Sequence, residues 1–164
     1  MSDITAEKTL DVARTIMEEA EFCVLVTLSE SGTAHARPMQ PFGPQEDFTL
    51  WFGASPTSRK VEELREDARA TVCFQEPGKG AYVTLLGEGW VVEDQELRKE
   101  HWRPSFERFW PKGPEGDDYV LIRFVPYRLE AMHMADGIAP EPFGLKPAVV
   151  TRRDDEWVLT GEGG

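Results

Sequence analysis

The stretch "FCVLVTLSESGTAHARPM", residues 22–39, decides the fold because it predicts an antiparallel hairpin. Its first part is rich in apolar and β-branched residues, which favour a strand over residues 22–28. The segment "SESG" then places Gly32, a residue that tolerates positive φ, in a tight turn before a second strand over residues 33–39. Strands joined this way pair in opposite directions, so the sequence begins an antiparallel sheet.

The segments that follow extend this sheet. We expect further strands at 48–54, 70–75, 81–93 and 118–134, the last of them broken near Pro126. The segment 81–93 is long, and its glycines, Gly87 and Gly89, predict a bulge or bend where a sheet curls. Sharp curvature is what a small barrel needs, so about six strands point to an antiparallel barrel or a strongly curled sheet.

Helices are few and short in this interpretation. Apolar residues at three- and four-residue intervals predict an amphipathic helix over 5–20, and shorter helices are expected at 61–68 and 94–102. Residues 135–147 are expected to form a loop, and residues 148–159 a closing hairpin with "RRDD" at its turn. We therefore expect one domain over residues 1–164, with its core at about 8–134 and a C-terminal loop and hairpin within 135–164.

The charge of the chain excludes some classes of partner. Thirty acidic side chains against eighteen basic ones give a net charge of -12, which repels phosphodiester backbones and anionic membranes. We expect no nucleic acid and no membrane as a partner. The sequence also shows no signal-like start and no long apolar run, so the expected location is the cytoplasm.

Cysteine and histidine give no sign of a metal site. Cys23 and Cys73 each lie in an apolar strand, where a free thiol behaves as a small buried hydrophobe, and a disulfide is the alternative. His35, His101 and His133 are far apart and lack the spacing of metal ligands. We therefore predict no metal.

The segment "GASPTSRK", residues 53–60, raises the question of an anion site. Ser55 suits an N-cap and Pro56 the first helical position, so a helix is expected to start there. A helix N-terminus is electropositive, and basic residues there are unfavourable unless an anion accompanies them. The parts of a phosphate site follow in order: Thr57, Ser58, Arg59 and Lys60. The alternative is a solvated helix in which Arg59 and Lys60 pair with Glu62 or Glu63.

The order of these elements resembles a known family. A hairpin ending in Arg37, Pro38 and Met39, a strand ending in an aromatic pair, "SRK" opening a helix, "LLGEGWVVED" and "HWRPSFERFWPKG" occur in sequence. Together they resemble the pyridoxamine 5′-phosphate oxidase-like flavin-binding split barrels, in particular their general stress protein branch, over about residues 8–130. The resemblance implies a mainly β (α+β) class, a six-stranded antiparallel split β-barrel with short flanking helices, and a homodimer with FMN at the subunit interface.

The resemblance also implies which residues contact FMN. Arg37, Pro38 and Met39 would lie along the flavin ring with Gln40 as a further donor, Trp51 and Phe52 would border it, and Ser58, Arg59 and Lys60 would hold the phosphate. Trp102 and Trp110 would reach the site from the partner subunit. The family often has a threonine after the aromatic pair, where this chain has Gly53 and Ala54, so Ser55 or Thr57 would supply the hydroxyl. Met39, Trp51 and Phe52 also suit an ordinary core, and the two tryptophans suit packing at a helix edge.

The expected function is that of an FMN-binding, oxidoreductase-like protein that transfers hydride or electrons to or from an unknown small substrate. We assign no catalytic residue, because flavin chemistry requires no side-chain base. The resemblance to true pyridoxamine phosphate oxidases fades in the C-terminal third, so vitamin B6 synthesis is not predicted. The alternatives are a flavin-binding stress or carrier protein without turnover, a haem protein using His35, His101 or His133, and a deazaflavin-binding protein on the same fold.

Overall fold

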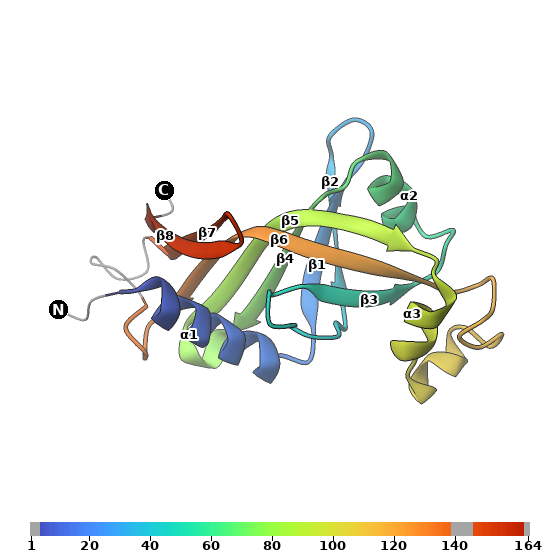
Figure 1. Cartoon of the computed structure of the whole chain (residues 1–164), viewed down its shortest axis with the longest axis horizontal. Coiled ribbons are helices and arrows are strands. Elements are labelled where there is room, and N and C mark those ends of the chain that lie inside the picture. The colour runs from blue at the N-terminus through green and yellow to red at the C-terminus, as the bar shows by residue number, and fades with distance from the viewer. Residues whose placement is uncertain (1–3, 139–145, 163–164) are drawn as a thin grey trace.

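The computed structural model describes residues 4–138 and 146–162 of the chain. Three α-helices flank a sheet, α1 (Ala6–Glu19), α2 (Arg59–Glu66) and α3 (Gln95–Glu100), with short 3₁₀ turns η1 (Pro77–Lys79) and η2 (Pro104–Arg108). The strands are β1 (Cys23–Leu28), β2 (Ala34–Met39), β3 (Leu50–Ala54), β4 (Arg69–Glu76), β5 (Ala81–Val92), β6 (Val120–His133), β7 (Ala148–Arg153) and β8 (Glu156–Glu162). Figure 1 shows α1 along the sheet at one end of the molecule and α3 with the segment after it at the other.

The described strands form a single antiparallel sheet in the order β2-β1-β4-β5-β6-β7-β8, with β3 paired to β6 beside this path. The six expected strands are β1 to β6, and the expected closing hairpin adds β7 and β8 to the same sheet. The mainly β, antiparallel class is therefore confirmed. In the described part of the chain, the six expected strands and the two strands of the hairpin make eight, and the path of paired strands does not return on itself, so the barrel is open.

Strand β6 runs unbroken through Pro126, which corrects the break expected there. Pro126 pairs in register with Gly87 of β5, at the point where the register between the two strands shifts. A proline has no N–H to give to a ladder and is tolerated at such a bulge. A Cβ at Gly87 would overlap the carbonyl of Val125, so the strands approach closely only because residue 87 is glycine.

Buried side chains form two clusters. The main cluster joins α1, through Ala13, Ile16 and Met17, to the inward side chains of the strands. The second cluster is aromatic, with Trp51, Phe106, Tyr119 and Leu121 at its centre, and lies between the end of β3 and η2. Phe106 and Trp110 of this second cluster line the site described below.

Helix α2 starts at Arg59 with Ser58 as its N-cap, three residues later than the start expected from Ser55 and Pro56. A separate turn comes first, in which the N–H of Ser58 donates to the carbonyl of Ser55 at 3.0 Å. The Ser58 hydroxyl also donates to that carbonyl, at 2.8 Å, and so does not cap the helix. The first N–H groups of α2 therefore have no side-chain acceptor from Ser58. None of the described helices has the length and apolar composition needed to cross a bilayer.

Candidate functional site

A hollow of about 430 Å³ lies where the ends of β2 and β3 meet the start of α2 and the segment 106–110. We call it the strand-end pocket. Its lining residues are Phe22, Pro38, Met39, Gln40, Gly53, Ala54, Ser55, Lys60, Phe106, Phe109 and Trp110. The pocket therefore brings together six residues predicted from the sequence: Pro38, Met39, Gln40, Ser55, Lys60 and Trp110.

One wall of the pocket is aromatic and is packed directly on β3. A Cβ at Gly53 would lie 3.0 Å from the rings of both Phe106 and Trp110, so glycine is what lets this segment approach the strand. The indole Nε1 of Trp110 donates a hydrogen bond to the hydroxyl of Ser55 at 3.0 Å. In this structure Trp110 thus lines the pocket of its own chain.

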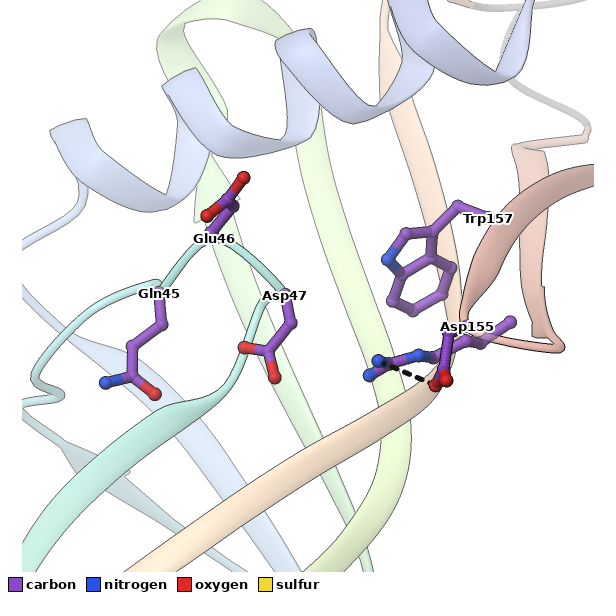
Figure 2. A pocket seen from close by; sticks show the side chains of 6 residues that line it. Gln45, Glu46, Asp47, Asp155 and Trp157 are labelled. Atoms are coloured by element: carbon purple, nitrogen blue, oxygen red, sulfur yellow. Dashed lines mark hydrogen bonds and ion pairs between the residues drawn. The ribbon is translucent and has the colours of Figure 1, made fainter.

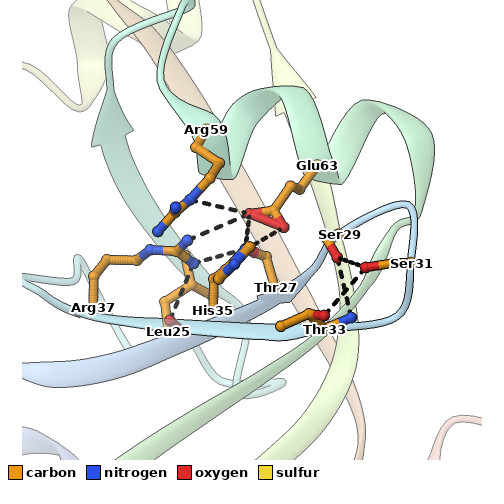
Figure 3. Close-up of polar contacts among 9 residues, drawn as sticks. All are labelled: Leu25, Thr27, Ser29, Ser31, Thr33, His35, Arg37, Arg59 and Glu63. Atoms are coloured by element: carbon orange, nitrogen blue, oxygen red, sulfur yellow. Dashed lines mark hydrogen bonds and ion pairs between the residues drawn. The ribbon is translucent and has the colours of Figure 1, made fainter.

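The opposite side of the strand-end region is cationic. The guanidinium of Arg37 donates to the Thr27 hydroxyl at 2.7 Å and to the carbonyl of Leu25 at 3.3 Å, both on β1, and lies beside Glu63 of α2 (Figure 3). Arg37 is not among the residues that line the pocket. Burial, and then the nearby charge of Arg37, lower the pKa of Lys60. No described residue forms an ion pair with Lys60, which lines the pocket.

Among the described residues, Glu63 of α2 is the carboxylate that pairs with Arg37 and Arg59. It is only 8% exposed, lies 2.9 Å from Nδ1 of His35, and forms ion pairs with Arg37 at 3.6 Å and with Arg59 at 3.8 Å. Burial alone would raise its pKa, but the hydrogen bond and charge of His35, the Thr27 hydroxyl and Arg37 together lower it below the ordinary value of 4.5. Figure 3 shows this carboxylate at the centre of the cluster.

The charges at the start of α2 do not balance. Glu62 and Glu63 offer two negative charges, whereas Arg37, Arg59 and Lys60 carry three positive ones. The pairing of Arg59 with Glu63 realises part of the solvated-helix alternative, although Arg59 remains 66% exposed. Lys60 and the free N–H groups of the first helical turn still lack an anionic partner among the described residues, which is the electrostatic character of an anion site.

The aromatic pair of β3 lies outside the pocket. Phe52 is fully buried in the main cluster. Trp51 belongs to the aromatic cluster, stacks on His101 with ring centroids 4.5 Å apart, and donates to Gln45 Oε1 at 3.3 Å. The structure therefore places both side chains in the core, which is the alternative interpretation of this pair.

The remaining predicted residues surround the pocket without lining it. Trp102 packs edge-on against Phe106 and Tyr119. Thr57 is exposed, and Ser58 is used in the turn before α2. Glu63 was not singled out as a site residue from the sequence, and its position four residues after Arg59 was the only local signal for it.

The three histidines lie elsewhere and have partners. His35 contacts Glu63, His101 stacks on Trp51, and the ring of His133 accepts from the N–H of Asp136 at 3.1 Å. No histidine lines the strand-end pocket. Within residues 4–138 and 146–162, no group of three or more histidine, cysteine or acidic side chains is placed to hold a metal.

A second hollow, of about 420 Å³, lies between the loop before β3 and the β7–β8 hairpin (Figure 2). It is lined by Gln45, Glu46, Asp47, Arg152, Asp155 and Trp157, and Arg152 is paired with Asp155 at 3.2 Å. Three carboxylates against one arginine do not suit an anionic ligand. This hollow also contains none of the residues predicted from the sequence.

The fold and the strand-end pocket define a class: a mainly antiparallel β protein with a pocket that joins an aromatic wall to an excess of positive charge. Comparison with protein families agrees with this class. Residues 8–152 match the model of the family described as pyridoxamine 5′-phosphate oxidase like. The chain belongs to this family.

Solved structures with a similar fold include general stress proteins and a relative named as FMN binding. General Stress Protein 26 from Bacillus anthracis is 26% identical, with a TM-score of 0.64 over 77% of this chain and 92% of that one. A pyridoxamine 5′-phosphate oxidase-related, FMN binding protein from Nostoc punctiforme is 15% identical, with a TM-score of 0.74 over 99% of this chain and 98% of that one. A protein related to general stress protein 26 from Clostridium acetobutylicum is 18% identical, with a TM-score of 0.74 over 90% and 96% of the two chains. The comparison with curated proteins finds no match.

Proposed function

We propose that the protein is a cytoplasmic homodimer that binds FMN in the strand-end pocket and uses it to oxidise or reduce a small substrate. The observation that carries this proposal is the pairing, in one pocket, of an aromatic wall with unbalanced positive charge at a helix start. Membership of the family and the FMN-binding relative from Nostoc punctiforme support it.

The groups available at the pocket suit the two ends of FMN. Lys60 in the lining, Arg59 beside it and the first N–H groups of α2 are all donors, and a phosphate is an acceptor with several oxygens. Met39, Phe106 and Trp110 offer apolar contact to a flat ring, and the amide of Gln40 offers both a donor and an acceptor to its polar edge.

The chain's own contribution would be binding and orientation. FMN supplies the transfer of hydride or single electrons when it is bound. Lys60 and Arg59 would fix the phosphate, while Met39 and Trp110 would hold the ring in one plane and exclude water from that face. Lys60 is the only titratable side chain in the pocket lining, so no side chain is assigned to proton transfer.

The homodimer is proposed from the surface beside the pocket. Phe22 and Phe109, both of which line the pocket, are 56% and 61% exposed. The apolar surface continues from Phe22 through Val24 and Pro38 into an adjoining hollow. A second copy of the chain that packs here would cover these side chains and close the pocket. Light scattering should give twice the chain mass of 18.5 kDa, and a monomer that still binds FMN tightly would contradict this arrangement.

The decisive experiment compares FMN with riboflavin, which lacks the phosphate. In a variant with Arg59→Ala and Lys60→Ala, we expect FMN affinity to fall about 100-fold through lost charge-assisted hydrogen bonds, with riboflavin affinity nearly unchanged. Arg65→Ala is the matched control, because Arg65 is a cation in the last turn of the same helix and pairs with Glu93. Equal losses for both ligands, or wild-type protein that binds no FMN, would refute the proposal.

A flavin-binding carrier without turnover is the second candidate, since it needs the same pocket as the enzyme. Reduction of the bound flavin by NADH or NADPH, followed by reoxidation with an acceptor, would favour the enzyme. The mass of a ligand that copurifies with the protein would distinguish FMN from a deazaflavin.

A further inference from the structure

We propose that the Ser55 hydroxyl donates a hydrogen bond to the phosphate of the ligand and that Trp110 is the residue that positions this hydroxyl. The inference rests on the proposed function and goes beyond it, because it selects one of two hydroxyls. Ser55 and Thr57 were both open as substitutes for the threonine that the family often has.

The argument starts from the direction of one hydrogen bond. An indole N–H can only donate, so in the 3.0 Å contact between Trp110 Nε1 and Ser55 Oγ the serine is the acceptor. The hydroxyl proton of Ser55 is therefore left to donate elsewhere. No hydrogen bond from this hydroxyl to another described residue is present, and Ser55 lines the pocket together with Lys60.

The hydroxyl is therefore free to donate a hydrogen bond to a ligand oxygen in the pocket. Lys60 is a donor only, and so is the indole N–H of Trp110. Lys60 and the Ser55 hydroxyl line the same pocket, where an anionic oxygen would accept from the hydroxyl and the ammonium together.

The position of Trp110 is set by its packing. Its ring meets Phe106 edge-on with centroids 4.9 Å apart and lies 5.1 Å from Tyr119. The missing Cβ of Gly53 makes room for it. The backbone of Ser55 is held from the other side, since its carbonyl accepts from both the N–H and the hydroxyl of Ser58. Both partners of the hydrogen bond are thus fixed before any ligand arrives.

Thr57 has none of these features. Its side chain is exposed and does not line the pocket. Gly53 admits Trp110, and Trp110 orients the hydroxyl of Ser55, two residues further along the chain.

The test measures the ratio of FMN affinity to riboflavin affinity in matched pairs of variants. Ser55→Ala should lower the ratio about 10-fold, the size expected for one hydrogen bond to a charged group, and Thr57→Ala should leave it unchanged. Ser55→Thr keeps the hydroxyl and should retain the wild-type ratio. Equal ratios for Ser55→Ala and Thr57→Ala would overturn the assignment.

A second pair of variants tests the positioning role. Trp110→Phe should lower the ratio about 3- to 10-fold, whereas Trp102→Phe, in the same aromatic cluster but away from the lining, should not. Loss of ring contact affects both ligands and cancels in the ratio. In the Ser55→Ala background Trp110→Phe should have no further effect on the ratio, because Trp110 acts through Ser55. An additive effect would refute the positioning role.

The outcomes also separate this inference from the proposed function. If wild-type protein binds FMN and riboflavin equally, the phosphate site itself is wrong. If wild-type protein prefers FMN, and the Arg59→Ala, Lys60→Ala variant loses this preference while Ser55→Ala keeps it, only the role of Ser55 is refuted.

Discussion

Replacing Glu63 with glutamine tests the electrostatic cluster behind the pocket. The substitution keeps the size and an acceptor oxygen but removes the negative charge that faces His35, Arg37 and Arg59. The half-buried guanidinium of Arg37 would then face the charges of Arg59 and Lys60 without compensation. Breaking a fully buried ion pair costs about 3–5 kcal/mol. Because Arg59 and His35 open the cluster to solvent, we expect the free energy of unfolding to fall by about 2 kcal/mol.

The assay is urea denaturation at neutral pH, with thermal melting as a second measurement. A loss of about 2 kcal/mol corresponds to a fall in midpoint of about 4–8 °C for a chain of this size. Glu62→Gln is the control, since Glu62 is an exposed neighbour on the same helix and should change stability by less than about 0.5 kcal/mol.

The pH dependence has a definite sign. The pKa of Glu63 is lowered in the folded state, so its stabilisation is complete above the ordinary value of 4.5 and is lost as the pH falls through the lowered pKa. The difference in unfolding free energy between wild type and Glu63→Gln should therefore shrink in acid. Equal stability of the Glu62 and Glu63 variants at neutral pH, or a difference that persists unchanged in acid, would refute this reasoning.

Two further predictions concern packing and thiol chemistry. Gly53→Ala should destabilise the protein by about 1–3 kcal/mol in urea denaturation, because the added methyl group meets two aromatic rings at 3.0 Å. Gly78→Ala is the control and should destabilise the protein less, because its methyl group meets only a flexible side chain. Equal losses of stability in the two variants would contradict this packing. Burial, with a smaller contribution from Cys73, raises the pKa of Cys23 to about 12, so Cys23 stays protonated at mildly alkaline pH. A thiol reagent should therefore label Cys73 before Cys23 in the native protein, and mass spectrometry showing the reverse order would contradict the burial argument.

Elements with a strong local signal could be predicted from the sequence. The apolar and β-branched run after residue 22 and the glycine turn give β1 and β2 to within one residue at each end. Local rules were wrong at Pro126 and Ser55. Proline is compatible with β6 because the bulge opposite Gly87 absorbs it, and an extra turn stabilised by Ser58 delays the start of α2.

The site was harder to predict from the sequence because its contacts join distant parts of the chain. Lys60 could be found from its place at a helix start. The Ser55 to Trp110 hydrogen bond spans 55 positions, and the contact of Glu63 with His35 spans 28, so neither leaves a local pattern. Whether Phe52 faces the core or the pocket depends on which side of the sheet the core lies. An aromatic residue near the end of a strand does not by itself indicate that side.

The pairing of β5 with β6 has a consequence for how the fold opens. Val91 pairs with Ile122 and belongs with the main cluster, whereas the next pair, Val92 and Leu121, belongs with the aromatic cluster. The β5–β6 ladder therefore contributes residues to both clusters, and separating these two strands would expose the main cluster and the aromatic cluster together. Amides in this ladder should exchange with solvent only through near-global unfolding. A ligand can therefore bind in the strand-end pocket, which is open and has no lining residue from β5 or β6, while these strands stay paired.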